Sequence, residues 1–230
     1  MVSTVPTLRL ERALLREGAR LVIGMDEVGR GAIAGPVAVG LSVVDLGTRT
    51  APEGLKDSKL LPELRREELQ PKVARWSRHA AVGMASNERI ESIGIIAALG
   101  LAATRALDAV REQGVDLTGA VVLLDGSHDW LTPALLRASA PPLRVTMKVK
   151  ADRSCAAVAG ASVLAKVARD RLMIDRDAVH PGYVWTSNKG YASAEHYAGI
   201  QAHGASALHR WSWLKQPGLF DLDAPVADIA

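Results

Sequence analysis

Three acidic residues stand at places where predicted strands end. Asp26 and Glu27 follow a short apolar run, and Asp125 follows a second run that is rich in β-branched residues. Ligands in open α/β sheets collect at the carboxyl ends of strands, so these carboxylates would meet if the two strands are neighbours. Singly, each position is more typical of a turn or a solvated strand end. Together, and beside glycines, they favour a functional acidic site.

A fourth carboxylate, Asp152, precedes a predicted helix and lies between basic residues. It is interpreted either as a helix N-cap, worth about 1 kcal/mol, or as part of the acidic site, and the two roles are compatible. Crowded carboxylates repel one another, and the usual remedy is a hard divalent cation with oxygen ligands. The six histidines are scattered and form no zinc-binding spacing. The pattern therefore indicates Mg²⁺ or Mn²⁺.

The elements that must position these residues alternate along the chain as in an α/β domain. Short apolar runs that end at turn residues predict strands over 21–25, 37–44, 80–85, 120–124 and 143–149. Apolar residues at helical spacing predict helices over 8–20, 60–73, 87–113, 153–173 and 193–203. The first two strands enclose a glycine-rich turn, which predicts a hairpin-like opening.

The composition is that of an ordinary globular protein, with 230 residues, 48% hydrophobic and 23% charged. A formal net charge of +3 with a pI near 9.2 permits a nucleic-acid partner without establishing one. The single cysteine, Cys155, excludes an internal disulfide and favours a reducing compartment. The longest apolar runs are shorter than the roughly 18 residues of a membrane span, and no signal-peptide core is visible. We therefore expect a cytoplasmic protein without a membrane partner.

Several ordered motifs resemble bacterial ribonuclease HII, the type 2 ribonuclease H. They are GMDEVGRG (24–31), AGPV (34–37), DSK (57–59), LDG (124–126), ASVLAKVARD (161–170) and NKGY (188–191), followed by His196. Each motif alone is weak, but the series spans about residues 21–213 and is specific. The resemblance implies an RNase H-like fold, a central mixed sheet flanked by helices, with a C-terminal helical extension. The expected division is a helical lead-in (1–20), a catalytic domain (21–213) and a flexible tail (214–230).

The resemblance also implies a catalytic, metal-binding set formed by Asp26, Glu27, Asp125 and Asp152. The family cleaves the RNA strand of RNA·DNA hybrids and incises duplex DNA 5′ of an embedded ribonucleotide, which serves primer removal and ribonucleotide excision repair. The products carry a 3′-hydroxyl and a 5′-phosphate. Such hydrolysis needs two metal ions about 3.5–4 Å apart, one that activates water and one that stabilises the leaving oxygen.

Substrate-reading residues follow from the same resemblance. The turn formed by Gly29, Arg30 and Gly31 reads the ribose 2′-hydroxyl, since glycine lets the backbone approach a ligand closely. Tyr191 corresponds to the tyrosine that packs on the adjoining deoxyribose; the alternative is an ordinary half-buried tyrosine. Five lysines are interpreted as phosphate contacts, although each taken singly is more typical of a solvated side chain: Lys56, Lys59, Lys150, Lys166 and Lys189.

Two departures from the family pattern affect the assignment. The segment between Asp125 and Asp152 is long for the family, which predicts either a longer surface loop or a shift of the fourth carboxylate, with Asp129 as the competing candidate. Trp213 stands where the family's His-Arg-x-Ser-Phe block has Phe, a change that preserves bulk.

The tail carries a further pattern. Gln216, Leu219 and Phe220 fit the Gln-x-x-Leu-Phe pattern of peptides that bind bacterial sliding clamps, while the alternative is that the two apolar residues fold back on the core. A monomer is expected. Two rival functions stay open: another RNase H-like nuclease of the resolvase or transposase type, and a catalytically silent hybrid-binding protein.

Overall fold

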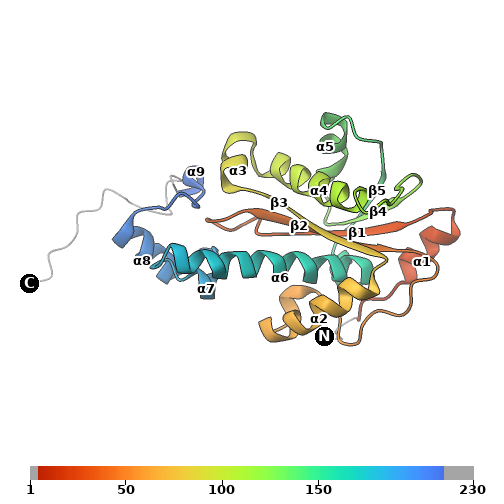
Figure 1. Ribbon diagram of the computed structural model, residues 1–230, viewed down its shortest axis with the longest axis horizontal. Helices are drawn as coiled ribbons and strands as arrows, with labels where there is room; N and C mark the ends of the chain where they lie inside the picture. Colours follow the sequence, from red (N-terminus) through yellow and green to blue (C-terminus); the bar gives the residue numbers. More distant parts are fainter. Residues whose placement is uncertain (1–4, 215–230) are drawn as a thin grey trace, which may run out of the picture.

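A single mixed sheet organises the computed structural model, which describes residues 5–214. Its spatial order is β3-β2-β1-β4-β5 (Figure 1). The strands are β1 (Val22–Val28), β2 (Val37–Val44), β3 (His79–Ala85), β4 (Val121–Asp125) and β5 (Arg144–Lys148). The first three pair antiparallel, whereas β4 lies parallel to both β1 and β5. The predicted mixed sheet and the hairpin-like opening are confirmed.

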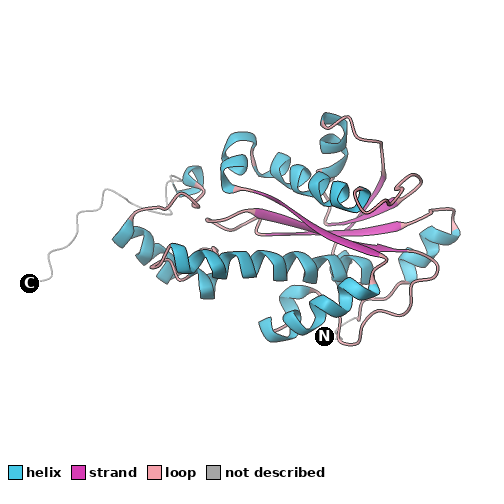
Figure 2. Cartoon of the chain, in the orientation of Figure 1, coloured by secondary structure: helices cyan, strands magenta, loops and turns pink. Residues whose placement is uncertain are grey.

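Helices cover both faces of this sheet (Figure 2). They are α1 (Arg9–Arg16), α2 (Glu63–Trp76), α3 (Asn87–Ile93), α4 (Ile95–Arg111), α5 (Leu131–Arg137), α6 (Ala156–Val179), α7 (Trp185–Asn188), α8 (Ala194–His203) and α9 (Trp211–Leu214), with 3₁₀ turns η1 (Ser58–Leu60) and η2 (Ala151–Arg153). Helix α4 packs on β2 and β3, and α6 packs on β1 and β2 from the other side. Helices α7 to α9 form the predicted C-terminal extension. None of the helices within residues 5–214 has the length and apolarity that a bilayer crossing requires.

The approach of α6 to the sheet is unusually close because two strand positions are glycine. A Cβ at Gly24 would lie 2.3 Å from the backbone carbon of Ala157, and one at Gly40 would lie 2.2 Å from the carbonyl oxygen of Ala161. Glycine inside a strand commonly marks such a close backbone approach. The contact brings the middle of α6, including Ser162 and Lys166, to the acidic end of β1.

Three predicted boundaries were wrong. Strand β1 continues to Val28 because its pairing with β2 extends to Ala38, so Asp26 and Glu27 lie inside the strand and not after it. The expected helix over 87–113 is interrupted at Gly94, where φ is +78°. Helix α6 begins at Ala156 with Cys155 as N-cap, so the N-cap role considered for Asp152 is wrong.

The long segment after β4 forms a helix that the sequence patterns did not predict. Leu131 and Leu135 of α5 are buried in the core cluster that also contains residues of α4. Asp129 accepts hydrogen bonds from the N–H groups of Leu131 and Thr132, at 3.0 and 2.9 Å. Its carboxylate is therefore used at the start of α5, which argues against Asp129 as the fourth carboxylate of the acidic site.

Candidate active site

The four carboxylates expected from the sequence lie at one end of the sheet. In the parallel pairing of β1 with β4, the last pair is Met25 with Leu124, and Asp26 and Asp125 come next on their strands. Asp125 then holds η2 in place, because its Oδ1 accepts the N–H of Ala151 at 2.6 Å. That bond brings Asp152, the next residue, into the electrostatic range of Asp125. Chain segments far apart in sequence thus converge on one acidic cluster.

Burial makes three of these carboxylates, Asp26, Glu27 and Asp152, hard to ionise. Burial raises the pKa of Asp26 well above its usual value; the nearby Ser162 hydroxyl opposes the rise, and the charges of Glu27 and Asp125 add to it. Burial likewise raises the pKa of Glu27. The pKa of Asp152 rises to about 6, through burial first and then the neighbouring carboxylates. Like charges in a poorly solvated site disfavour the ionised form, and a cation would reverse that effect.

Two buried oxygens in this cluster have no hydrogen-bond partner within residues 5–214, Oδ2 of Asp26 and Oδ1 of Asp152. Buried polar atoms in folded proteins are nearly always paired, so such atoms call for an explanation such as an ion. No three acidic, histidine or cysteine side chains in the described chain gather as a complete ion cage. Mg²⁺ is commonly held by one or two carboxylates, with water and substrate phosphate as its other ligands. The residues fit ions bound in that open way.

Sequence reasoning left one carboxylate out of the acidic cluster. Asp57 is only 1% exposed, and its charge adds to the rise in the pKa of Asp152. Its Oδ1 accepts the N–H of Lys59 at 2.9 Å, and its Oδ2 lies 3.4 Å from Nε of Arg153. The DSK motif (57–59) contains Asp57, but an acidic residue in a polar loop is usually solvated, so the sequence alone did not place it in the cluster.

Lys59 places positive charge among the carboxylates. Burial lowers the pKa of Lys59, but the charges of Asp26, Asp57 and Asp152 outweigh it and leave the pKa above its usual value. The lysine therefore stays charged at neutral pH and reduces the repulsion inside the cluster.

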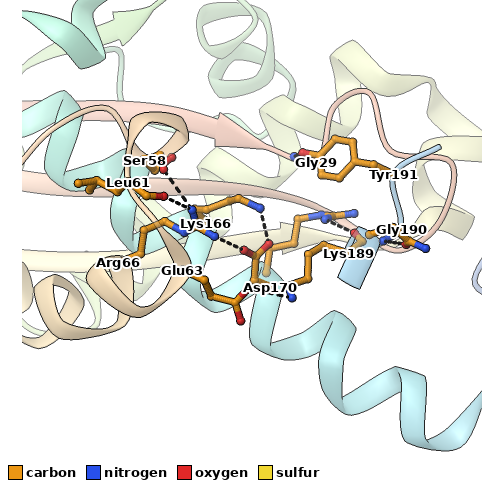
Figure 3. A network of polar contacts seen from close by, with 12 residues as sticks. Gly29, Ser58, Leu61, Glu63, Arg66, Lys166, Asp170, Lys189, Gly190 and Tyr191 are labelled. Carbon is orange, nitrogen blue, oxygen red and sulfur yellow. Dashed lines mark hydrogen bonds and ion pairs between the residues drawn. The ribbon is translucent and has the colours of Figure 1, made fainter. Parts of the chain in front are cut away.

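A cavity of about 650 Å³ opens beside the cluster. Its lining comprises Glu27, Val28, Gly29, Arg30, Gly31, Ser58, Lys59, Lys166 and Tyr191. The N–H of Gly29 donates to Oη of Tyr191 at 3.0 Å, and Figure 3 shows the two residues facing each other. Gly29 has φ of +85°, and a Cβ there would lie 2.1 Å from Nε of Arg169. This position therefore requires glycine.

The five lysines differ in their surroundings. Lys59 and Lys166 line the cavity, and the Lys166 ammonium also pairs with Asp170 at 2.6 Å (Figure 3). Lys189 is buried, with its ammonium bonded to the Thr186 carbonyl and 3.0 Å from Glu63. Lys56 and Lys150 lie outside the cavity lining.

Comparison with known proteins assigns the chain to a family. The family model described as Ribonuclease HII matches residues 23–216. The chain belongs to the ribonuclease HII family. Ribonuclease HII of Streptomyces griseus subsp. griseus is 45% identical to it, over 90% of this chain and 84% of that protein. Membership makes the chain a type 2 ribonuclease H, an endonuclease that hydrolyses RNA in RNA·DNA hybrids, and decides against the resolvase-type alternative.

Solved structures confirm the RNase H-like fold. Bst-RNase HIII in complex with Mn²⁺ has a TM-score of 0.65 and 22% identity, with 84% of this chain and 65% of that chain covered. RNase HII from Archaeoglobus fulgidus, solved with PCNA, has a TM-score of 0.63 and 23% identity, with 90% and 98% covered.

Proposed function

We propose that this ribonuclease HII cuts the RNA strand of RNA·DNA hybrids and also incises duplex DNA 5′ of a single embedded ribonucleotide, leaving a 3′-hydroxyl and a 5′-phosphate. The observation that carries the proposal is the pair of unpartnered, buried oxygens on Asp26 and Asp152 beside a cavity bordered by the Gly29 turn. The carboxylate oxygens would bind the metal ions, and the Gly29 turn would approach the sugar of the substrate. Such incision would serve primer removal and ribonucleotide excision repair in the cytoplasm.

For the chemical step, we assign Asp26, Glu27, Asp125 and Asp152 as ligands of divalent cations, Mn²⁺ or Mg²⁺. Two such ions supply an activated water and stabilisation of the leaving 3′-oxygen. The backbone N–H of Glu27 donates to Oδ1 of Asp26 at 2.8 Å, which leaves Oδ2 to face an ion. Oδ1 of Asp125 is used by Ala151, so its second oxygen is the one available.

For recognition, we assign the turn of Gly29, Arg30 and Gly31 to the 2′-hydroxyl. Within the described chain no hydrogen bond uses the backbone N–H of Arg30 or Gly31, and nothing lies within 4 Å of a Cβ built at Gly31. Two adjacent donors with open space in front of them suit a hydroxyl oxygen as acceptor. The ring of Tyr191, at the same cavity, would pack on the adjoining deoxyribose, where a 2′-hydroxyl would disturb the contact.

Phosphate contacts divide according to the surroundings of each lysine. Lys59 and Lys166 line the cavity and suit the phosphates next to the cut. Lys56 and Lys150 would reach only more distant phosphates. Lys189 is buried, lies outside the cavity lining and has protein partners for its ammonium, so its contribution would be the weakest.

We further propose that the chain works as a monomer tethered to a sliding clamp by its tail. The pattern residues Gln216, Leu219 and Phe220 lie outside the described residues, and the Archaeoglobus fulgidus relative has been solved with PCNA. Deletion of residues 216–230 should abolish capture by the clamp and leave nuclease activity intact. Unchanged capture would contradict the tail as the docking segment.

The deciding experiment uses a DNA duplex that carries one ribonucleotide. With Mn²⁺ or Mg²⁺ we expect a single cut 5′ of that nucleotide, and no cut in an all-DNA duplex or in EDTA. Binding of the duplex without any cut would support the silent hybrid-binding alternative, and cutting of the all-DNA duplex would refute recognition of the 2′-hydroxyl.

A further inference from the structure

A buried arginine from the far end of the chain holds the recognition turn. Arg210 is fully buried, and its guanidinium donates to the carbonyl oxygens of Gly29 at 2.7 Å, Arg30 at 2.9 Å and Gly35 at 3.1 Å. Its own backbone N–H donates to the carbonyl of Ile33 at 2.8 Å. One residue therefore binds the loop between β1 and β2 at four carbonyls.

The bonds to the carbonyls of Gly29 and Arg30 also fix the N–H groups on the opposite sides of the same two peptide groups. A trans peptide is planar, and its C=O and N–H point in opposite directions. The carbonyl of Gly29 shares its plane with the N–H of Arg30, and the carbonyl of Arg30 shares its plane with the N–H of Gly31. By binding both carbonyls, Arg210 sets the direction of the two unpaired donors at the cavity.

The planar guanidinium suits this task better than an ammonium would. Its N–H donors form a rigid fork, whereas lysine offers a flexible point charge. The indole of Trp213 lies 4.7 Å from Cζ of Arg210, close enough for a cation–π contact on the guanidinium face. The Trp that replaces the family's Phe thus supports Arg210 in the orientation that the loop needs.

We infer that Arg210 is a positioning residue that sets the selectivity of this enzyme for a ribose 2′-hydroxyl. The inference rests on the proposed role of the Gly29–Gly31 turn. Arg210 lies on the protein side of the turn, so it would act on the substrate only through the two peptide groups. Its loss should weaken the reading of the hydroxyl more than the binding of the phosphate backbone.

The test is a cycle that pairs a protein change with a substrate change. Cleavage rates are measured for duplexes that carry one ribonucleotide or its 2′-fluoro analogue, which lacks the hydroxyl, with wild type and Arg210→Lys. We expect the ratio of the two rates to fall by roughly tenfold in the variant, because coupling between groups that act together is lost. Affinity for an all-DNA duplex should stay unchanged. An unchanged ratio in a folded variant would overturn the inference.

Substitutions at Trp213 keep the test decisive if Arg210→Lys fails to fold. Trp213→Leu leaves no unpaired polar group yet removes the aromatic face, so the ratio should fall by a smaller factor, and less again for Trp213→Phe. Tyr183→Phe is the matched control, since it removes a 2.8 Å bond to the Gly204 carbonyl in the same region. Its ratio should equal that of wild type even if its melting temperature drops. A fall in the control equal to that of Trp213→Leu would show a merely structural role.

The same data separate the two proposals. Failure of the wild-type enzyme to cut the ribonucleotide duplex refutes the proposed function itself. Cutting by wild type with a ratio that Arg210→Lys and Trp213→Leu both preserve refutes only the role of Arg210.

Discussion

The acidic end of β1 and β4 and the neighbouring turn at residues 29–31, to which we assign 2′-hydroxyl recognition, are built in opposite ways. The acidic end contains buried carboxylate oxygens without partners and several raised pKa values. At the turn, by contrast, carbonyls from Gly29 to Pro36 are bonded by two buried arginines, Arg169 and Arg210. The contrast teaches that the acidic end holds repelling carboxylates that an ion would stabilise, whereas the carbonyls of the turn are already hydrogen-bonded before any ligand arrives.

The largest expected effect is at the acidic end of the sheet. Asp26→Asn should remove nearly all turnover, because it replaces a proposed metal ligand, yet spare hybrid binding, which depends on the positive surface. It should also raise the free energy of unfolding by about 1 kcal/mol, since a buried, poorly ionised carboxylate is removed. Cleavage assays, binding titrations and denaturant unfolding measure the three quantities. Turnover at the wild-type rate would refute the metal-site assignment.

The next effect concerns two buried histidines near the turn, His196 and His209. His209 accepts the N–H of Ser206 at Nδ1 (2.8 Å), so its Nε2–H faces Nε2 of His196 at 3.1 Å, and His196 Nδ1–H donates to the carbonyl of Tyr191 at 2.8 Å. This arrangement requires both rings to be neutral. Burial lowers the pKa of His209 to about 4 and also lowers that of His196.

Because the unfolded chain binds these protons near pH 6.5 and the folded chain does not, the histidines stabilise the fold above pH 6.5, and this contribution is lost as the pH falls toward 4. For His209 alone it is roughly 3 kcal/mol. Denaturant unfolding at pH 7.5 and pH 5 should show the loss, and His209→Gln should reduce it. Carboxylates with raised pKa values make the fold more stable at low pH, in wild type and in His209→Gln alike. The difference between the pH dependences of the two proteins therefore reports on His209 alone. Equal pH dependence would contradict the neutral pair.

A smaller effect is expected at Tyr191, which lies at the cavity and bonds the turn. Tyr191→Phe removes the acceptor for the N–H of Gly29 and keeps the ring, so cleavage at an embedded ribonucleotide should fall by up to about tenfold in kcat/KM, the equivalent of one hydrogen bond. Tyr191→Ala, which also removes the ring that would contact the sugar, should fall further. Equal values for the two variants would show that the ring contributes nothing.

The smallest effect distinguishes two lysines. Lys166→Met should weaken hybrid binding a few-fold and reduce the dependence of log affinity on log salt by about one. Lys189→Met should leave that slope nearly unchanged, because Lys189 lies outside the cavity lining and its ammonium is bonded to Thr186 and Glu63. It should instead lower the melting temperature. Identical salt slopes in the two variants would remove the distinction.

The sequence predicted the parts of the molecule that depend on local pattern and strand ends. The five strands and the convergence of Asp26 with Asp125 followed from apolar runs and parallel pairing. The end of β1 was misplaced because pairing with β2 carries polar residues into the strand. Helix α5 was missed because the segment before it reads as a loop, and its apolar residues become helical only against α4. The contacts of Asp57 and Arg210 join segments that no local pattern connects.

The hydrogen bond between Arg210 and Gly29 joins residues 181 positions apart. Closing so distant a contact is among the slow steps of folding, and during synthesis it must wait until residue 210 has been added. All four carboxylates have been translated by residue 152, nearly 60 residues before the arginine that orients the turn. On the ribosome, therefore, the four carboxylates are present before Arg210 can bind the carbonyls of the turn, and the proposed selectivity for a 2′-hydroxyl would arise after the acidic cluster.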